Sequence, residues 1–450
     1  MFGQLFAIAR NTFVESIRQP VYFILLMVGG LAQVFNLLLS GFSMGFSEEK
    51  EVSGDDKLLL DMGLATVMVC ATLLAAFIAT NVLTREIENR TVLTVVSKPV
   101  GRPLFVIGKF FGVSAAMTMA VTIMLTFLMF ALRHKVMSTA RDVIDPVVVL
   151  CVSASVLGPI ALGTWGNYFY GWVFSSTTTL AMLPATIIGY VCSLAVDKEW
   201  AIQPLTKEFK PQILVAAFCA LMAVLVLSSV AIALSTRLGQ VMTIVGCGAI
   251  FMLGLLSNYL FGRYAFSNQQ IAIIKDVEWP DNEPTTLTSA GQTVIVALDS
   301  SPRETIRAGS SFYYGSDPSG LEQAVPEHPR FGGDAKNNAD VRNPEMGKAL
   351  VVRDMGTDHR VTLVNANGLE VKRPPVKGDY AFAKPTRRNV PARVAWSVIP
   401  NIQAFWLVDA ITQGHKIPPR YVGLLAAYSG AQIVCFLSLA VFLFQRRDMG

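Results

Sequence analysis

Histidine and cysteine side chains can bind metals or act in catalysis, but their spacing in this sequence fits neither role. No H-E-x-x-H, G-x-S-x-G or C-x-x-C motif occurs, and every cysteine falls inside an apolar run, where a thiol is usually a small buried hydrophobe. The histidines are scattered through polar segments: His134, His328, His359 and His415. The sequence therefore predicts no enzymatic centre, no metal site and no cofactor.

Two further classes of protein are disfavoured by motif and charge. No G-x-x-x-x-G-K-[ST] loop occurs in the 450 residues, so we expect any ATP to be hydrolysed by another polypeptide. The formal net charge of +5 is modest for this length, which gives no support to nucleic-acid binding.

The segment 84–109 has the charge pattern with the clearest mechanistic meaning. Its first part mixes both signs and holds Arg85, Glu86, Glu88, Arg90 and Thr91. Basic residues alone would mark the cytoplasmic flank of a membrane span, and that bias does not require the two glutamates. A surface that docks on another protein uses both signs. We therefore expect a cytoplasmic coupling segment here, with a solvated connector as the alternative.

Apolar runs of membrane-spanning length flank this segment and recur along the chain. Hydrophobic residues make up 52% of the sequence and charged residues 15%, more apolar than a soluble domain. The clear runs are Val21–Phe42, Leu58–Leu83, Leu104–Leu132, Ile213–Leu234, Val241–Phe261 and Tyr421–Phe444. The apolar stretch 146–196 is interrupted by aromatic residues and gives either two more spans or one re-entrant segment. The sequence thus predicts an α-helical polytopic membrane protein with six to eight spans.

An amphipathic helix is expected before the first span, over residues 1–20. Its apolar positions follow helical spacing and include Phe2, Phe6 and Phe13, while Arg10 and Arg18 lie elsewhere on the helix. We interpret it as a helix in the lipid interface, followed by a span and not by a cleavage site.

Basic residues indicate the orientation of the spans. Arg10 and Arg18 precede the first span, and Arg446 follows the last, so both termini should be cytoplasmic and the number of spans even. We expect the protein in a bacterial inner membrane.

The region 263–419 differs from the rest because it holds turn-rich loops and short alternating stretches such as Thr293–Leu298 and Arg360–Val364. It is expected to be an inserted, β-rich extracytoplasmic domain. The predicted organisation is a helix at 1–20, a membrane domain at 21–262, this domain at 263–419, and a last span with a cytoplasmic tail at 420–450.

Several short segments resemble those of type-2 ABC exporter permeases. They are Arg10–Glu15, Arg85–Thr91, Ser97–Arg102, Gly108-Lys109 and Ala231–Arg237. Within that family the chain is most similar to the subgroup associated with copper-enzyme maturation in bacteria. The resemblance covers about residues 1–132, 213–262 and 421–448, so the stretch 146–196 and the long external domain are additions to the usual six spans.

This resemblance implies roles for the segments described above. The helix 1–20 would be the elbow helix, and Glu86–Val96 the coupling helix seated in a cleft of the ATPase. Two permeases, as a homodimer or a pair, would assemble with two ATPase subunits and with membrane lipid. The leading hypothesis is therefore the permease of an ABC exporter with an unknown substrate. The alternative is a membrane-anchored sensor or assembly protein that transports nothing.

Overall fold

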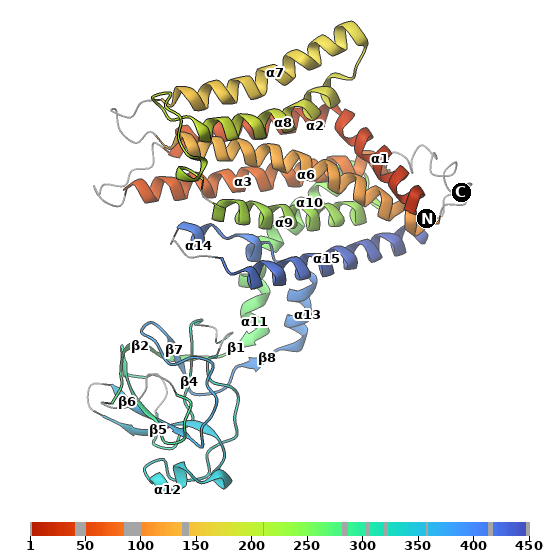
Figure 1. Cartoon of the computed structure of the whole chain (residues 1–450). Coiled ribbons are helices and arrows are strands. Elements are labelled where there is room, and N and C mark those ends of the chain that lie inside the picture. Colours follow the sequence, from red (N-terminus) through yellow and green to blue (C-terminus); the bar gives the residue numbers. More distant parts are fainter. Residues whose placement is uncertain are drawn as a thin grey trace. The chain divides into compact units, whose positions relative to one another are not determined.

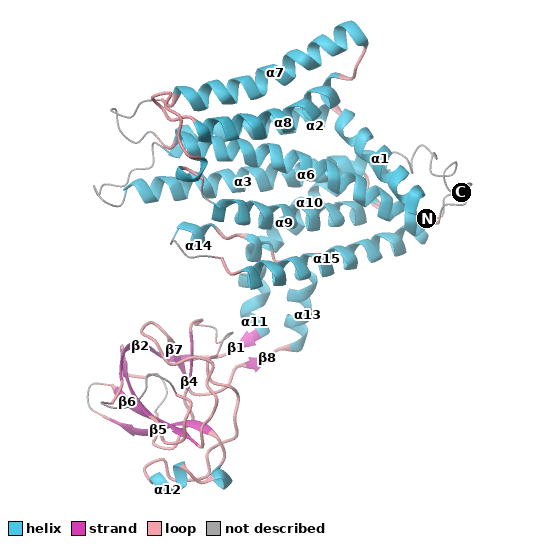
Figure 2. Cartoon of the chain, viewed as in Figure 1, coloured by secondary structure: helices cyan, strands magenta, loops and turns pink. Residues whose placement is uncertain are grey.

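The protein is represented by a computed structural model with two compact units (Figure 1). It describes residues 2–40, 51–84, 101–136, 144–209, 211–280, 287–302, 306–318, 320, 323–356, 359–412 and 417–446. Residues 1–255 with 400–450 form the membrane unit, and residues 256–399 form the barrel unit. Helices dominate the first unit, whereas the strands belong to the second (Figure 2).

Seven described helices are long and apolar enough to cross a membrane by themselves. They are α2 (Pro20–Ser40), α3 (Glu51–Ala79, continued by the π-helical turn η1, Thr80–Thr84), α6 (Arg102–His134), α7 (Pro146–Tyr170), α8 (Phe174–Ala195), α9 (Pro211–Ser235) and α15 (Pro419–Gln445). About two thirds or more of the spanning residues of α3, α6 and α9 are buried, against a third or fewer in the other four. The core of the membrane unit therefore lies around α3, α6 and α9. The predicted polytopic α-helical class is confirmed.

An eighth candidate span is broken. The sequence predicts one continuous span over Val241–Phe261, but α10 ends at Leu255, and the π-helix η3 (Asn258–Gly262) and the short α11 (Arg263–Ala265) follow it. Only the two pieces together reach the length and apolarity of a span.

The stretch 146–196 forms two helices, so the re-entrant alternative is wrong. α7 ends at Tyr170, and the left-handed φ of 67° at the following Gly171 lets the chain reverse into α8. The helices then approach closely, since a Cβ on Gly163 would stand 2.0 Å from Thr178 Oγ1. The aromatic cluster around Trp172 lies at this reversal, where side chains such as Tyr168 are exposed.

Hydrogen bonds show which helix ends lie together. Ser175 Oγ at the start of α8 donates to Arg18 O of α1 (Phe2–Arg18), and Arg102 Nη1 at the start of α6 donates to Gln445 O of α15. We call this the terminal end of the membrane unit, because α1 and the last turn of α15 lie there (Figure 1). At the opposite end Trp406 Nε1 donates to Asp61 Oδ1 of α3.

The spans alternate between these two ends. With the broken α10 counted, the described residues contain eight candidate spans, an even number, and α1 and the last turn of α15 share the terminal end. Residues 402–412 form the short helices η5 (Ile402–Phe405) and α14 (Val408–Thr412), which belong to the membrane unit.

The barrel unit contains an antiparallel sheet with strand order β4-β7-β2-β3-β6-β5. Its strands are β2 (Gln270–Glu278), β3 (Thr293–Leu298), β4 (Tyr313–Gly315), β5 (Ala349–Met355), β6 (Arg360–Ala366) and β7 (Tyr380–Phe382). The two outer strands also meet, because Ser311 bridges Val351 and Phe312 N donates to Leu350 O over 2.9 Å. Through this contact the sheet closes into a barrel. The prediction of a β-rich domain before the last span is confirmed, including strands at Thr293–Leu298 and from Arg360.

Apolar side chains pack on both sides of the barrel wall. The interior is filled by large residues such as Phe312, Tyr314 and Phe382, all at most 1% exposed. A smaller cluster with Phe331 and Val341 packs against Val351 of β5 and includes the short helix α12 (Asn338–Val341). The single-turn η4 (Pro344–Met346) follows it.

Candidate coupling site

The amphipathic helix α1 packs on the first turns of α6. A Cβ on Gly108 would stand 2.7 Å from Ile8 Cγ2, and one on Gly112 would stand 2.5 Å from both the Ala9 carbonyl oxygen and Thr12 Cβ. Because the two glycines lie four residues apart, they form one groove on α6, the arrangement by which small residues let membrane helices approach closely. The side chains of Ile8 and Thr12 and the Ala9 carbonyl group of α1 fill that groove.

A charged contact fixes the same pair of helices. Lys109 is 2% exposed, and its Nζ lies 3.7 Å from a Glu15 carboxylate oxygen and 5.4 Å from the centre of the Phe105 ring. A buried ammonium is stable only with such partners, so Glu15 and Lys109 favour one register of α1 on α6.

The reversal between α1 and α2 is tied to three other helices. Tyr22 is fully buried, and its hydroxyl donates to Ala116 O of α6 over 2.7 Å. Asn81 Nδ2, within the π-helical turn η1, donates to Gln19 Oε1 over 2.9 Å. Ser175 Oγ of α8 donates to Arg18 O over 2.7 Å. The elbow between α1 and α2 is therefore bonded to η1, α6 and α8 at once.

The last span, α15, also contacts the start of α6. Arg102 Nη1 donates to Gln445 O over 3.0 Å, and the Phe105 ring stacks on Phe444 with centroids 5.8 Å apart. Phe444 is fully buried. The start of α6 is therefore held between α1 and the end of α15. We call the contacts of α1, η1, the start of α6 and the end of α15 the coupling frame.

The segment expected to couple to an ATPase connects two parts of the coupling frame. Its proposed contact residues, Arg85, Glu86, Glu88, Arg90 and Thr91, lie outside the described residues. The described ends are η1, which ends at Thr84, and α6, which begins at Arg102 with a proline in its first turn. The last part of the predicted segment, 102–109, is thus the beginning of a span. A π-helical turn such as η1 often occurs at functional sites.

The residues expected to form the elbow helix differ in their exposure. Phe2 and Phe6 are 88% and 71% exposed, and Phe13 is half-buried against the core of the membrane unit. Arg10 and Arg18 are exposed. α1 meets α6 through a face with Ile8, Ala9 and Thr12, and of these three only Ala9 is among the apolar positions at helical spacing. Small side chains allow closer helix contact than phenylalanines do, whereas lipid accepts the phenylalanines. The missed signal was the Gly-x-x-x-Gly pattern at Gly108–Gly112.

A second polar cluster lies at the opposite end of α6. Arg133 Nη1 lies 3.2 Å from Asp145 Oδ2, and both side chains are at most 3% exposed. Asp145 also accepts from the amides of Val147 and Val148 and so caps α7. A second guanidinium nitrogen of Arg133 lies 3.9 Å from Asp197, after α8. This cluster joins the ends of three spans.

Asp197 is the solvent-facing member of that cluster. The Lys198 amide donates to its carboxylate, and this bond, followed by the nearby Lys207 and Arg133 charges, lowers the pKa of Asp197. His134, which sequence spacing assigned to a polar segment, is in the last turn of α6 and 7% exposed. Its Nε2 accepts from the Asp145 amide over 3.4 Å.

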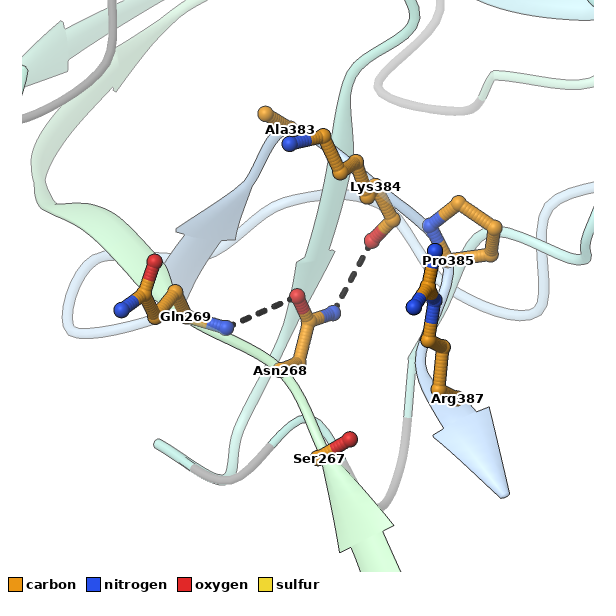
Figure 3. A pocket seen from close by; sticks show the side chains of 7 residues that line it. All are labelled: Ser267, Asn268, Gln269, Ala383, Lys384, Pro385 and Arg387. Atoms are coloured by element: carbon orange, nitrogen blue, oxygen red, sulfur yellow. Dashed lines mark hydrogen bonds between the residues drawn. The ribbon is translucent and has the colours of Figure 1, made fainter. Parts of the chain in front are cut away.

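The barrel unit has a shallow polar cleft of about 250 Å³ where β1 (Phe266–Ser267) leads into β2 and β7 leads into β8 (Arg387–Arg388). Asn268 bridges its floor, because Oδ1 accepts from the Gln269 amide and Nδ2 donates to Lys384 O (Figure 3). Arg387 lies at its edge. No nucleophile and base come together here, and no group of metal-ligating side chains occurs among the described residues of the chain.

Comparison with known proteins matches the part of the chain that contains most of α1, η1 and the start of α6. Residues 6–170 match the model of the ABC-2 family transporter proteins. The match includes α7, which the sequence resemblance had treated as an addition to the family. No curated protein and no solved structure matches the chain. Residues 6–170 are therefore similar to the ABC-2 family transporter proteins, and the described residues include several helices of membrane-spanning length.

Proposed function

We propose that this chain is the permease subunit of an ABC exporter, which moves or extracts a substrate with ATP hydrolysed by a separate cytoplasmic subunit. The terminal end then faces the cytoplasm of a bacterial inner membrane, and segment 84–101 docks on the ATPase. A second permease copy completes the assembly. The finer resemblance to copper-enzyme-maturation permeases belongs to this proposal and rests on Arg10–Glu15 and Arg85–Thr91.

The observation that supports it is the coupling frame. The segment begins at η1 and ends at α6. Glu15 of α1 pairs with Lys109 of α6, and Gln19, directly after α1, accepts from Asn81 of η1. A displacement of the segment by a closing ATPase would therefore move the ends of α3 and α6 together with the elbow. Two spans linked in this way can change their arrangement as a unit.

Charge reversal in the segment tests the proposal. We expect Glu86→Arg with Glu88→Arg to abolish co-purification of the ATP-hydrolysing subunit with the full-length protein from native membranes, because opposite charges at the docking surface become like charges. The measurement is ATPase activity and subunit stoichiometry in the purified complex.

The matched control is Glu199→Arg with Glu370→Arg, which makes the same change in net charge at two exposed positions outside the coupling frame. It should leave the association intact. If the Glu86 and Glu88 variant keeps its partner, or if the native protein carries no ATP-hydrolysing subunit, the permease proposal is wrong and the non-transporting sensor becomes the better hypothesis.

A further inference from the structure

Three short helices and a two-stranded ribbon connect the barrel to the membrane unit in sequence. η3, α11 and β1 cover residues 258–267, and β8 and α13 (Val390–Val398) cover residues 387–398. The ribbon pairs Phe266 with Arg388 and Ser267 with Arg387. We call these two segments the stalk. Its second segment ends two residues before Pro400, where the membrane unit resumes.

The helix α13 of the stalk has an exposed apolar stripe. Val390, Val394 and Val398 follow one another at intervals of four residues and are 65%, 56% and 57% exposed. No residue of α13 is buried. Three valines on one face of a nine-residue helix are unfavourable in water but suit the boundary between lipid headgroups and acyl chains.

The stalk also carries exposed aromatic rings paired with arginines. The Arg263 guanidinium lies 4.4 Å from the centre of the Tyr259 ring and 4.6 Å from that of Tyr264. Both tyrosines are more than half exposed. Arg393 lies 5.5 Å from the centre of the Phe266 ring. Aromatic residues with arginine are typical of the membrane interface, where one part of the side chain is apolar and the other is hydrated.

Trp396 of α13 contacts the first segment of the stalk. Its ring meets Phe266 edge to face at 6.1 Å, and its Nε1 lies 3.1 Å from Asn258 Oδ1, to which it donates. This contact joins the two segments of the stalk, so the aromatic and valine surfaces belong to one structure.

The charge of the stalk differs from that of the barrel. Residues 256–267 and 387–399 contain four arginines and no carboxylate: Arg263, Arg387, Arg388 and Arg393. The barrel, residues 268–386, has 13 basic and 16 acidic residues. No described carboxylate lies within ion-pair distance of the last three arginines, and all four are exposed. Anionic phosphate groups complement such a surface.

We propose that the stalk lies in the membrane interface and binds anionic phospholipid headgroups. The valine stripe of α13 contacts the upper part of the acyl chains, and the arginines bind the phosphates. Arg387 of the stalk also lines the polar cleft of the barrel unit (Figure 3). Lipid thereby holds the two ends of the barrel at a defined depth, independently of any ATPase.

Spin labels test the position of the helix. In full-length protein with its native cysteines replaced and reconstituted in vesicles, we expect a label at Val394→Cys to be severalfold more accessible to oxygen than to a water-soluble nickel complex. Val376→Cys is the matched control, because Val376 is 52% exposed on the barrel. Its label should show the reverse preference. A label at Val394 that behaves like the one at Val376 would overturn the proposal.

Lipid retention tests the role of the arginines. Reconstituted in equal amounts of phosphatidylglycerol and phosphatidylcholine, the wild-type chain should keep phosphatidylglycerol preferentially after extraction. Arg388→Gln with Arg393→Gln should reduce that preference by about fivefold for each arginine. Arg342→Gln with Arg353→Gln, on the barrel, should leave it unchanged. Equal retention of both lipids by the wild type, or equal loss in both variants, would show that the stalk does not select anionic headgroups.

Discussion

Gly112→Leu should release the elbow helix α1 from α6 and, on the function proposed above, uncouple the protein from the ATPase subunit. Even a single added carbon at this position would stand 2.5 Å from the Ala9 carbonyl oxygen, and backbone cannot move aside as a flexible side chain can. Overpacking of this kind costs about 1–3 kcal/mol of stability. Here it would weaken the contact between α1 and α6 within the coupling frame. We expect faster hydrogen exchange in α1, a lower unfolding temperature in nanodiscs, and loss of ATP-driven turnover.

Gly430→Leu is the control for this prediction. Gly430 is also inside a span, but no atom lies within 4 Å of its added carbon. Leucine is a better helix former than glycine, by about 0.8 kcal/mol, so the control should be neutral or more stable. If both leucine variants unfold at the same temperature and keep the protection of α1, the glycine groove does not hold the elbow.

Arg133→Leu should destabilise the membrane unit more than any other single change at the end opposite the coupling frame. It leaves the buried carboxylate of Asp145 without its cation, and breaking a buried pair from one side costs about 3–5 kcal/mol. Asp145→Asn should cost less, because Arg133 keeps Asp197 at 3.9 Å and the asparagine still caps α7. Denaturant titration of the reconstituted protein measures both.

Two further variants serve as controls for the Arg133→Leu prediction. The double variant Arg133→Leu with Asp145→Asn should recover most of the loss, since no unpaired buried charge remains. Lys207→Gln removes a pair with Asp197 in which both side chains are more than a third exposed, and it should cost less than about 1 kcal/mol. Equal losses for Arg133→Leu and Lys207→Gln would mean that the cluster at Arg133 is hydrated.

The membrane class, most of the spans and some of the strands could be predicted from the sequence, because each depends on residues that are close together in the chain. Run length and apolarity identified the spans, and alternation identified β3 and the start of β6. The break after α10 was missed, because the apolar run continues through residues 256–261 and apolarity does not report helix continuity.

The candidate coupling site was predictable only in part. Mixed charge and family resemblance pointed to Arg85–Thr91, but contacts such as Gln19 with Asn81 or Ser175 with Arg18 join residues 62 and 157 positions apart. No local pattern specifies such partners. The phenylalanine face of α1 was the obvious candidate for packing, yet the closest contact is made by Ala9 and Thr12 against Gly112.

The sequence by itself determined that this chain resides in a membrane, that a β-rich domain precedes its last span and that segment 84–109 is unusually charged, since composition and periodicity are sums over neighbouring residues. Only the tertiary structure decided that residues 146–196 form two spans, that the sheet closes through Ser311 and Val351, and that α1 is locked to α6. Each of these depends on whether residues far apart in the sequence fit together in space. The two spans depend on the reversal at Gly171, and the closed sheet depends on the contact between its outer strands. The packing of α1 on α6 depends on the space left at Gly108 and Gly112.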